Sequence, residues 1–509
     1  MYVNDIGVNF PECQQFPFHR QRTFEGRSVK RPSIGHFGPQ SAPFSLTVLQ
    51  MGRYNRVRTR KSDHHEITGW QVQRLRRYSM RKVISMVVLT LVVSVSMLFA
   101  NGSSEKSSSA AGSPVSLTLA YPSGDSKVDI MKEIVKSYVK EKGGAQQVNV
   151  VVVPASGASY WGSYFDKIQT MIAGGTAPDV VRVAIEGIQT FVARDLALPL
   201  DQYMKSDPQP VLNYSDLAPK LQAPFVIDGK TYGFVWDWNN VVIHINTDML
   251  KAVGLPIPPS NWSLSDFLKY AKALTRTVNG QQVYGFAVPN YYFGMEGWLY
   301  ANGAGILTDD QKRGALDTPK AEQIVQLFHD MIYRDKVSPV PTPSTDAVNL
   351  MVTGKVAMIS AGRWPFGTYV PNKFTTVAVQ YIPLMANPRK VVFGSGAFPV
   401  IKATPHPKEA YELSAFLSGA YSQKTGIAID SIPTRISVMK EVLPTTPGEN
   451  WQIFSESADF AAGVQAPPGY PEIASIFDRY TGAVWSNQMD VPTAMQKASA
   501  EMTQVLANQ

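Results

Sequence analysis

Five consecutive residues bring together side chains that could recognise a ligand: Trp236, Asp237, Trp238, Asn239 and Asn240. A carboxylate and two amides make directional hydrogen bonds, whereas indole rings pack against apolar faces. Because five such side chains are hard to bury together, we expect at least one of the tryptophans to contact a bound molecule. The alternative is that one tryptophan belongs to the core and that Asp237 caps a turn.

Residues that carry covalent or metal chemistry do not form a catalytic pattern in this sequence. There is no G-x-S-x-G, no H-E-x-x-H and no phosphate-binding loop. Four of the seven histidines lie in the first 65 residues, and His244, His329 and His406 lack metal-ligand spacing. The single cysteine is Cys13, so disulfides, thiolate metal sites and cysteine nucleophiles are excluded from the rest of the chain. We expect no catalytic residue, no metal and no cofactor.

A strand, a helix and a second strand are predicted over residues 148–185. Residues 148–153 and 180–185 are mostly apolar runs, rich in β-branched residues and typical of buried strands. The apolar spacing of residues 164–172 predicts a short helix between them. This order indicates parallel strands joined by a right-handed crossover.

Polar and aromatic residues follow both of these strands. In an open α/β sheet, ligands bind beyond the carboxyl ends of the strands. Ser156, Tyr160 and Trp161 follow the first strand, and Glu186 follows the second. We expect these four residues at the ligand-binding edge, although Glu186 could instead be a solvated loop acid and Tyr160 and Trp161 could pack at the helix start.

Strands and helices alternate along the rest of the chain, which indicates an α/β fold. Ser263 and Asp266 have the spacing of a capping box and predict a helix start. Further helices are expected over residues 129–139, 191–198, 407–417 and 494–506 and from 319 onward, and further strands over 115–121, 241–245, 284–288, 355–360 and 391–401.

The front of the chain differs in composition from the remainder. Residues 1–79 show no periodicity, and we interpret them as a disordered or spurious extension, with a basic interaction arm as the alternative. Residues 80–100 combine Arg81 and Lys82 with an uncharged apolar run, the layout of a secretory signal or an uncleaved membrane anchor. Residues 101–114 then form a Ser/Gly-rich linker.

The basic excess of the chain is confined to this front part. Residues 1–100 hold 15 Lys+Arg and 5 Asp+Glu, whereas the remaining residues hold 33 and 35. The body therefore has no positive excess to meet a phosphate backbone. We expect no nucleic-acid partner.

An ordered set of motifs resembles the extracellular solute-binding proteins of family 1, the sugar-type binding proteins of ABC importers. The matching pieces run in family order along nearly the whole of residues 115–509: IAGGTAPDVV (172–181), LPLDQY (198–203), DGKTYGF (228–234), INTDMLKAVGLPIPPSNWSLSDFLKYAKALT (245–275), YGF (284–286), GKVAMISAGRW (354–364) and HPKEAYELSAFLS (406–418). The chain departs from the family pattern in lacking a lipid-modified cysteine after the signal.

The resemblance implies a two-lobed periplasmic binding protein fold of type II, with discontinuous lobes and a hinge between them. Lobe one is expected at 115–236 plus 355–402, and lobe two at 240–354 plus 403–509. The implied function is capture of a sugar or oligosaccharide in the interlobe cleft and delivery to the transmembrane subunits of an ABC permease. A monomer outside the cytoplasm, exported or anchored through residues 80–100, is expected.

The resemblance also implies which residues bind the ligand. Sugars present hydroxyls at their edges and C–H faces above and below, which suit acids, amides and aromatic rings. The expected ligand-binding set is Ser156, Tyr160, Trp161, Glu186, Trp236, Asp237, Trp238, Asn239, Tyr291, Tyr292, Trp298, Arg363, Trp364, Ser395, Gly396 and Arg435. Acids and rings favour a neutral sugar, while Arg363 and Arg435 leave an acidic sugar open.

Two other functions stay open at this point. A sensor subunit could use the same fold to present a ligand to a membrane receptor. A secreted carbohydrate hydrolase would need two carboxylates at a separation of roughly 5–9 Å. Glu186, Asp237 and Glu296 are the available acids, but nothing in their spacing marks a pair.

Overall fold

The computed structural model describes residues 114–125, 127–155, 160–207, 213–342, 345–427, 430–442, 450 and 452–509. All of them belong to one unit of the chain, Ser108–Gln509. The expected extension at 1–79, the expected signal at 80–100 and nearly all of the expected linker lie outside the described residues.

A three-stranded parallel sheet forms the centre of the first half of this unit, which we call lobe one. Its strands are β1 (Val115–Pro122), β2 (Gln146–Val153) and β3 (Val180–Val181), and β1 lies between the other two. The parallel pairing confirms the predicted strand–helix–strand unit. Both β2 and β3 pair with β1 rather than with each other, because the crossover passes over one strand position.

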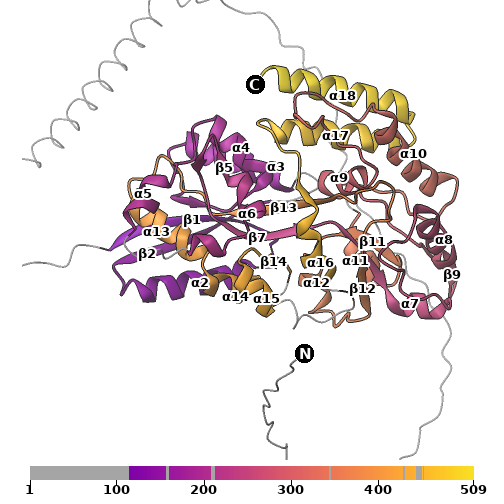
Figure 1. Cartoon of the computed structure of the whole chain (residues 1–509), viewed down its shortest axis with the longest axis horizontal. Helices are drawn as coiled ribbons and strands as arrows, with labels where there is room; N and C mark the ends of the chain where they lie inside the picture. Colours follow the sequence, from indigo (N-terminus) through magenta and orange to yellow (C-terminus); the bar gives the residue numbers. More distant parts are fainter. Residues whose placement is uncertain are drawn as a thin grey trace, which may run out of the picture. The chain divides into compact units, whose positions relative to one another are not determined.

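Helices surround the sheet of lobe one (Figure 1). They include α2 and α3 from the first part of the chain and two helices from a much later part, which contact α2. The bounds are α2 Val128–Glu141, α3 Tyr160–Ala173, α4 Ile185–Ala193, α5 Asp201–Ser206, α6 Pro219–Gln222, α13 Pro407–Leu417, α14 Ala420–Gly426 and α15 Ile436–Val442. Two short strands, β5 (Val226–Ile227) and β6 (Lys230–Thr231), form a hairpin.

A second three-stranded sheet, antiparallel, forms the centre of lobe two. Strand β8 (Val242–Asn246) lies between β11 (Met358–Ala361) and β12 (Val377–Gln380). The helices and the hairpin of this lobe are α7 Thr247–Ala252, α8 Leu264–Leu274, α9 Tyr292–Ala301, α10 Pro319–Tyr333, α11 Ala347–Val352, α12 Phe366–Tyr369, β9 Arg276–Val278 and β10 Gln281–Val283.

A third sheet lies between the lobes, and we call it the joining sheet (Figure 1). Its strands are β14 (Ile432–Pro433), β7 (Val235–Asn240), β13 (Val391–Ala397) and β15 (Ala461–Gly463), with β4 (Val183–Ala184) paired to β13. The chain ends in α16 (Gln452–Glu456), α17 (Tyr470–Trp485) and α18 (Val491–Ala507). Helix α17 contacts α3 and α4 of lobe one as well as α9 and α10 of lobe two.

The strand pairing corrects the expected lobe boundaries. The sequence interpretation placed residues 355–402 in lobe one, yet β11 and β12 pair with β8 and therefore belong to lobe two. It placed 403–509 in lobe two, yet α13 contacts β1 and β3, and α14 contacts α2. Motif order along the chain does not reveal which distant strand or helix completes a sheet, and this explains both errors.

Several local predictions are confirmed and two are wrong, one of which is the strand expected at 284–288, where only isolated bridges form at Tyr284 and Ala287. The capping box forms, since Ser263 Oγ accepts from the Asp266 amide at 3.1 Å and Asp266 Oδ2 accepts from the Ser263 amide at 3.1 Å. Helix α13 has the expected bounds. The helix expected at 191–198 instead spans Ile185–Ala193, because the chain turns from β4 directly into α4. Glu186 therefore lies in a helical first turn.

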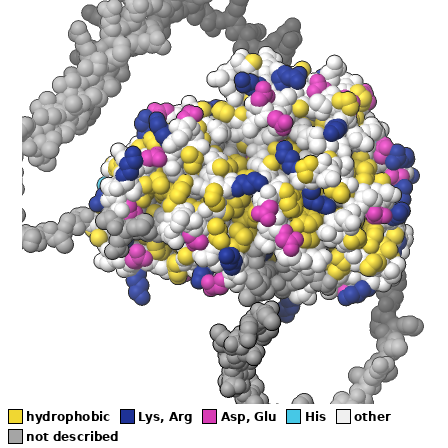
Figure 2. All heavy atoms as spheres, viewed as in Figure 1, with side chains coloured by type: hydrophobic (Ala, Val, Ile, Leu, Met, Phe, Trp, Pro, Cys, Tyr) yellow, Lys and Arg dark blue, Asp and Glu magenta, His cyan; other side chains and the backbone are white. Residues whose placement is uncertain are grey.

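Charged side chains are mixed over the visible surface of the unit. Figure 2 shows Lys and Arg beside Asp and Glu on this face, with no large area of one sign. This distribution agrees with the near balance of charges after residue 100.

The capping box should contribute measurably to stability. Ser263→Ala removes an acceptor for a helix-terminal amide, and we expect the free energy of unfolding to fall by about 1 kcal/mol. Urea denaturation measures this change. Ser265→Ala, at an exposed position of the same first turn, is the matched control and should be near neutral. Equal effects of the two substitutions would contradict the role of the cap.

Candidate functional site

A cavity of about 830 Å³ lies between lobe one, lobe two and the joining sheet. Its lining comes from the loop after β1, from α3 and α4, from β7 and β13, and from α9, α11, β11 and α12. The volume is in the upper part of the roughly 300–1,000 Å³ typical of small-molecule sites. Residues of both lobes therefore face the same cavity.

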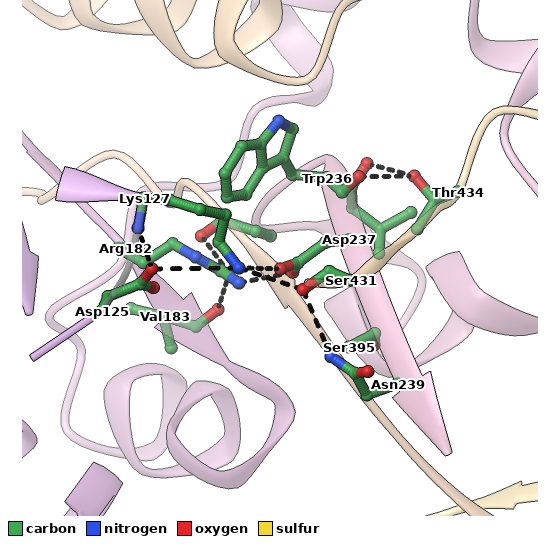
Figure 3. Close-up of polar contacts among 12 residues, drawn as sticks. Asp125, Lys127, Arg182, Val183, Trp236, Asp237, Asn239, Ser395, Ser431 and Thr434 are labelled. Atoms are coloured by element: carbon green, nitrogen blue, oxygen red, sulfur yellow. Dashed lines mark hydrogen bonds and ion pairs between the residues drawn. The ribbon is translucent and has the colours of Figure 1, made fainter. Parts of the chain in front are cut away.

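Five charged residues make up one wall, which we call the charged floor. Lys127 Nζ donates to Asp430 Oδ1 at 2.9 Å and lies 3.6 Å from Asp237 Oδ2 and 3.9 Å from Asp125 Oδ1. Arg182 donates through Nη2 to Oδ1 of Asp237. Figure 3 shows Lys127 and Arg182 pointing toward Asp237. The charged floor therefore joins four chain segments, which carry Asp125 with Lys127, Arg182, Asp237 and Asp430.

Pairing with carboxylates keeps the two cations of the charged floor ionised despite their burial. Burial lowers the pKa of Lys127, but the carboxylates of Asp125, Asp430 and Asp237 outweigh it and leave that pKa raised. Burial also lowers the pKa of Arg182, and Asp237 leads the groups that raise it above its usual value. Removing one partner from such a buried pair typically costs about 3–5 kcal/mol, because a charge is left without compensation.

Alternation along β7 determines which of its polar and aromatic side chains face the cavity. Successive side chains of a strand point to opposite faces. Asp237 and Asn239 share the face that lines the cavity. Trp236 on the opposite face is fully buried, with its ring centroid 5.3 Å from that of Phe398. Trp238 lines the cavity but is only 1% exposed, and its Nε1 donates to the backbone of the joining sheet.

Half-buried aromatic rings form the two opposite sides of the cavity. Tyr160 and Trp161 come from α3 of lobe one. Tyr291, Phe293 and Trp364 come from lobe two, and the Trp364 ring centroid lies 6.2 Å from that of Tyr291 and 6.1 Å from that of Phe293. The accessible parts of these half-buried rings offer apolar faces to a ligand.

Glu186 is the buried acid of the lining that lacks a cationic partner at ion-pair distance within the described residues. It is 5% exposed and lies in the first turn of α4, where its own backbone amide donates to the carboxylate. Among the described residues, Oε2 has no hydrogen-bond partner. Burial raises the pKa of Glu186 to about 7, against the smaller opposing effects of its own amide and Arg182. A ligand donor could satisfy this oxygen.

The cavity brings together most of the sequence-predicted site residues that the structure describes. Tyr160, Trp161, Glu186, Asp237, Trp238, Asn239, Tyr291, Tyr292, Trp364 and Ser395 line it. Trp236, Trp298, Arg363, Gly396 and Arg435 are described but do not line it. Ser156 lies outside the described residues.

The five described residues that do not line the cavity correct the sequence interpretation. Trp298 is fully buried in an aromatic cluster of lobe two, with its Nε1 donating to Ser360 Oγ at 2.7 Å. Arg363 is 1% exposed and donates through Nη1 to the backbone oxygen of Ser431. Arg435 donates to Ser418 O at 3.0 Å. These side chains hold the lobes and loops together instead of facing the cavity.

Gly396 also has a structural role in place of the expected ligand contact. A Cβ at this position would overlap Nη1 of Arg182. The missing side chain therefore lets the guanidinium lie against β13 and reach Asp237.

Sequence reasoning missed Asp125, Lys127, Arg182 and Asp430 in the charged floor and Phe293 in the aromatic wall. The rule that ligands bind beyond strand ends would have found three of them. Asp125 and Lys127 follow β1, and Arg182 lies between β3 and β4. Asp430 carries no such signal, since it reaches the cavity through the packing of a distant segment.

Comparison with known proteins identifies the family. Residues 133–454, more than half of the chain, match the family of bacterial extracellular solute-binding proteins. The chain belongs to this family. Members of the family bind solutes and are non-enzymatic, which agrees with the absence of a catalytic motif in the sequence.

Curated relatives of this solute-binding protein match part of its length. A binding protein of Brucella abortus is 30% identical over 238 residues, which are 45% of this chain and 53% of the relative. A lipoprotein of Streptomyces antibioticus is 25% identical over 335 residues, or 61% of this chain and 70% of the relative. The chain spans about half the length of the Brucella relatives that it matches.

Solved structures share the fold of this solute-binding protein. An ABC substrate-binding protein of Listeria monocytogenes in complex with cycloalternan has a TM-score of 0.70 at 22% identity, covering 77% of this chain and 99% of that one. The maltose-bound MalE3 of T. maritima has a TM-score of 0.66 at 18% identity, covering 77% and 100%. These likenesses confirm the predicted two-lobed α/β fold.

The expected membrane segment is not among the described helices. None of the helices in the described part of the chain combines the length and apolar character needed to cross a bilayer. Residues 80–100, where a signal or anchor is expected, lie outside it.

Two buried glutamates predict a stability that falls as pH rises. Burial raises the pKa of Glu186 to about 7 and that of Glu296 to about 8, from 4.5. Between the ordinary pKa of 4.5 and these raised values, the folded protein holds protons that the unfolded chain has released. The free energy of unfolding should therefore decrease from pH 5 to pH 8. We expect Glu186→Gln and Glu296→Gln each to raise stability relative to the native protein at pH 8, by on the order of a few kcal/mol, and to have little effect at pH 5.

Chemical denaturation at several pH values measures this difference. Glu472→Gln, at an exposed position of α17, is the control and should leave the pH profile unchanged. A difference between each buried variant and the native protein that stays constant from pH 5 to pH 8 would contradict the account.

Proposed function

We propose that this protein is the extracytoplasmic substrate-binding component of an ABC importer and captures a neutral sugar or oligosaccharide. The observation that carries the proposal is the cavity with aromatic rings on both lobes and carboxylates between them. Rings can stack on the C–H faces of a sugar while carboxylates accept from its hydroxyls. The cavity of about 830 Å³ also offers the volume that an oligosaccharide requires.

The charge of the cavity favours a ligand without negative charge. Its lining holds five acids, Asp125, Glu186, Asp237, Asp346 and Asp430, against two bases. Both bases, Lys127 and Arg182, are already paired within the charged floor. Arg363 and Arg435 do not line the cavity, so they no longer support an acidic sugar.

The mechanism that we propose is passive. A ligand held between Trp161 of lobe one and Trp364 of lobe two would bridge the lobes. Such a ligand stabilises the closed arrangement by its greater affinity for that state. The closed protein would then dock on the permease, which takes up the ligand.

Solved structures that share this fold and contain sugars support this proposal. The Listeria neighbour was solved with cycloalternan and the T. maritima neighbour with maltose. A neighbour from Mycobacterium tuberculosis was solved with glycerophosphocholine, which is not a sugar (TM-score 0.66, 15% identity). The fold therefore accommodates several polar, hydroxyl-bearing ligands.

Export completes the proposal. Residues 80–100 would direct the protein across the cytoplasmic membrane, where the binding component of an importer must act. An N terminus near Asn101 on the exported protein would support cleavage, and an intact Met1 terminus on a cytoplasmic protein would argue against export.

A thermal-shift screen of residues 101–509, which contain the whole unit Ser108–Gln509, tests the ligand class. We expect neutral sugars or oligosaccharides to raise the unfolding temperature and galacturonate to leave it unchanged, because the lining carries an acid excess.

Trp161→Ala and Trp364→Ala should each reduce calorimetric affinity at least about tenfold. Tyr421→Ala, half-exposed away from the cavity, is the control. Stabilisation by acidic sugars alone, or unchanged affinity in both tryptophan variants, would refute the proposal.

A further inference from the structure

Strand β13 lines the cavity with two residues, Gly394 and Ser395, and is half-buried at only one of them. Six of its seven residues are buried, and only Gly394 is half-buried. Gly394 lines the cavity and pairs with Asn239 of β7, whose side chain lines it too. The backbone of a central strand is therefore accessible to a ligand at this point.

The fold does not need glycine at position 394. A Cβ there would lie 3.4 Å from Cζ of Phe293 and 3.9 Å from Oε1 of Glu186, which are ordinary contact distances. At Gly396, two residues along the same strand, a Cβ would overlap the guanidinium of Arg182. Packing thus explains the glycine at 396 and leaves the one at 394 without a packing reason.

The space above Gly394 is flanked by an unsatisfied acceptor and a ring. Glu186 Oε2 is buried and has no hydrogen-bond partner among the described residues. A buried oxygen in this state costs free energy until a donor reaches it. Phe293 is half-buried on the other side of the same space. A group that fits there would combine a hydrogen-bond donor with an apolar surface.

We propose that Gly394, Glu186 and Phe293 form a ligand subsite, the Gly394 subsite, which takes a hydrogen-bond donor carried on an apolar ring face. The absent side chain at Gly394 sets the specificity by allowing the ligand ring to approach the strand. This inference rests on the proposed function and adds to it the position and chemistry of one contact. The donor is a hydroxyl of a neutral sugar or an ammonium of an amino sugar.

Dependence on pH distinguishes these two donors. An ammonium group binds best to an ionised carboxylate, so its affinity should vary strongly with pH: it should rise as Glu186 ionises around its raised pKa of about 7 and fall again as the ligand amine loses its proton. A hydroxyl can donate to the carboxylate oxygen in either protonation state. Its affinity should change little over the same range.

The test uses a series of three glycine variants with two readouts. Gly394→Ala should keep the native unfolding temperature and fill the subsite. Gly482→Ala, where a Cβ meets nothing within 4 Å, is the matched control for binding and, as a glycine-to-alanine change inside helix α17, should leave affinity unchanged and raise the unfolding temperature slightly. Gly396→Ala should lower the unfolding temperature, because Arg182 must move. It serves as the comparison for a glycine that packing requires.

The first readout is a crystal structure of the native protein and of Gly394→Ala, both grown with glycerol. In the native protein we expect a glycerol hydroxyl or a water to donate to Glu186 Oε2 above Gly394, and we expect it to be displaced in Gly394→Ala. A protein donor satisfying Oε2, or a protein side chain filling the space in the native crystal, would overturn the subsite.

The second readout is calorimetry with maltose, cellobiose and glucosamine at pH 6 and pH 8. Any of these that binds the native protein should bind Gly394→Ala about tenfold more weakly and Gly482→Ala equally well. Undiminished affinity in Gly394→Ala would overturn the subsite while leaving the proposed function intact. If none of the three binds the native protein, the proposed sugar ligand is contradicted, and the crystal structures still decide on the subsite.

Discussion

The buried pairing of Arg182 and Lys127 with Asp237 is the interaction on which the site depends. It ties the loop after β1, the turn between β3 and β4, and the central strand β7 to one another at the base of the cavity. Each of these segments would otherwise bury an isolated charge, which is strongly unfavourable. The position of β7 relative to lobe one is therefore held by charge compensation as well as by strand pairing.

The rest of the cavity is built on this arrangement. Gly396 gives Arg182 room against β13, and the same strand then presents Gly394 to the cavity two residues earlier. Helix α4 starts directly after β4 and places Glu186 beside that point. Because the two cations are occupied by carboxylates of the floor, the polar groups left for a ligand are mainly acceptors. This is the physical reason for expecting a neutral or donor-rich ligand.

Local features were predictable from the sequence, whereas long-range partners were not. The capping box at Ser263 and the bounds of α13 depend on neighbouring residues, and both predictions are confirmed. Period-two alternation along β7 could have shown that Trp236 and Asp237 point to opposite faces. The partners of Arg363 and Asp430 depend on which distant segments pack together, and no pattern within one segment encodes that. For the same reason, the sequence interpretation placed β11 and β12 in lobe one, although both belong to lobe two.

The central claim is that one ligand is held by both lobes across the charged floor. The most direct measurement is a crystal structure of the protein with the neutral sugar that stabilises it most. The account predicts a sugar in the cavity that contacts Trp161 on lobe one and Trp364 on lobe two. This sugar makes no ion pair with Lys127 or Arg182. A sugar bound to one lobe alone, or outside this cavity, would contradict it.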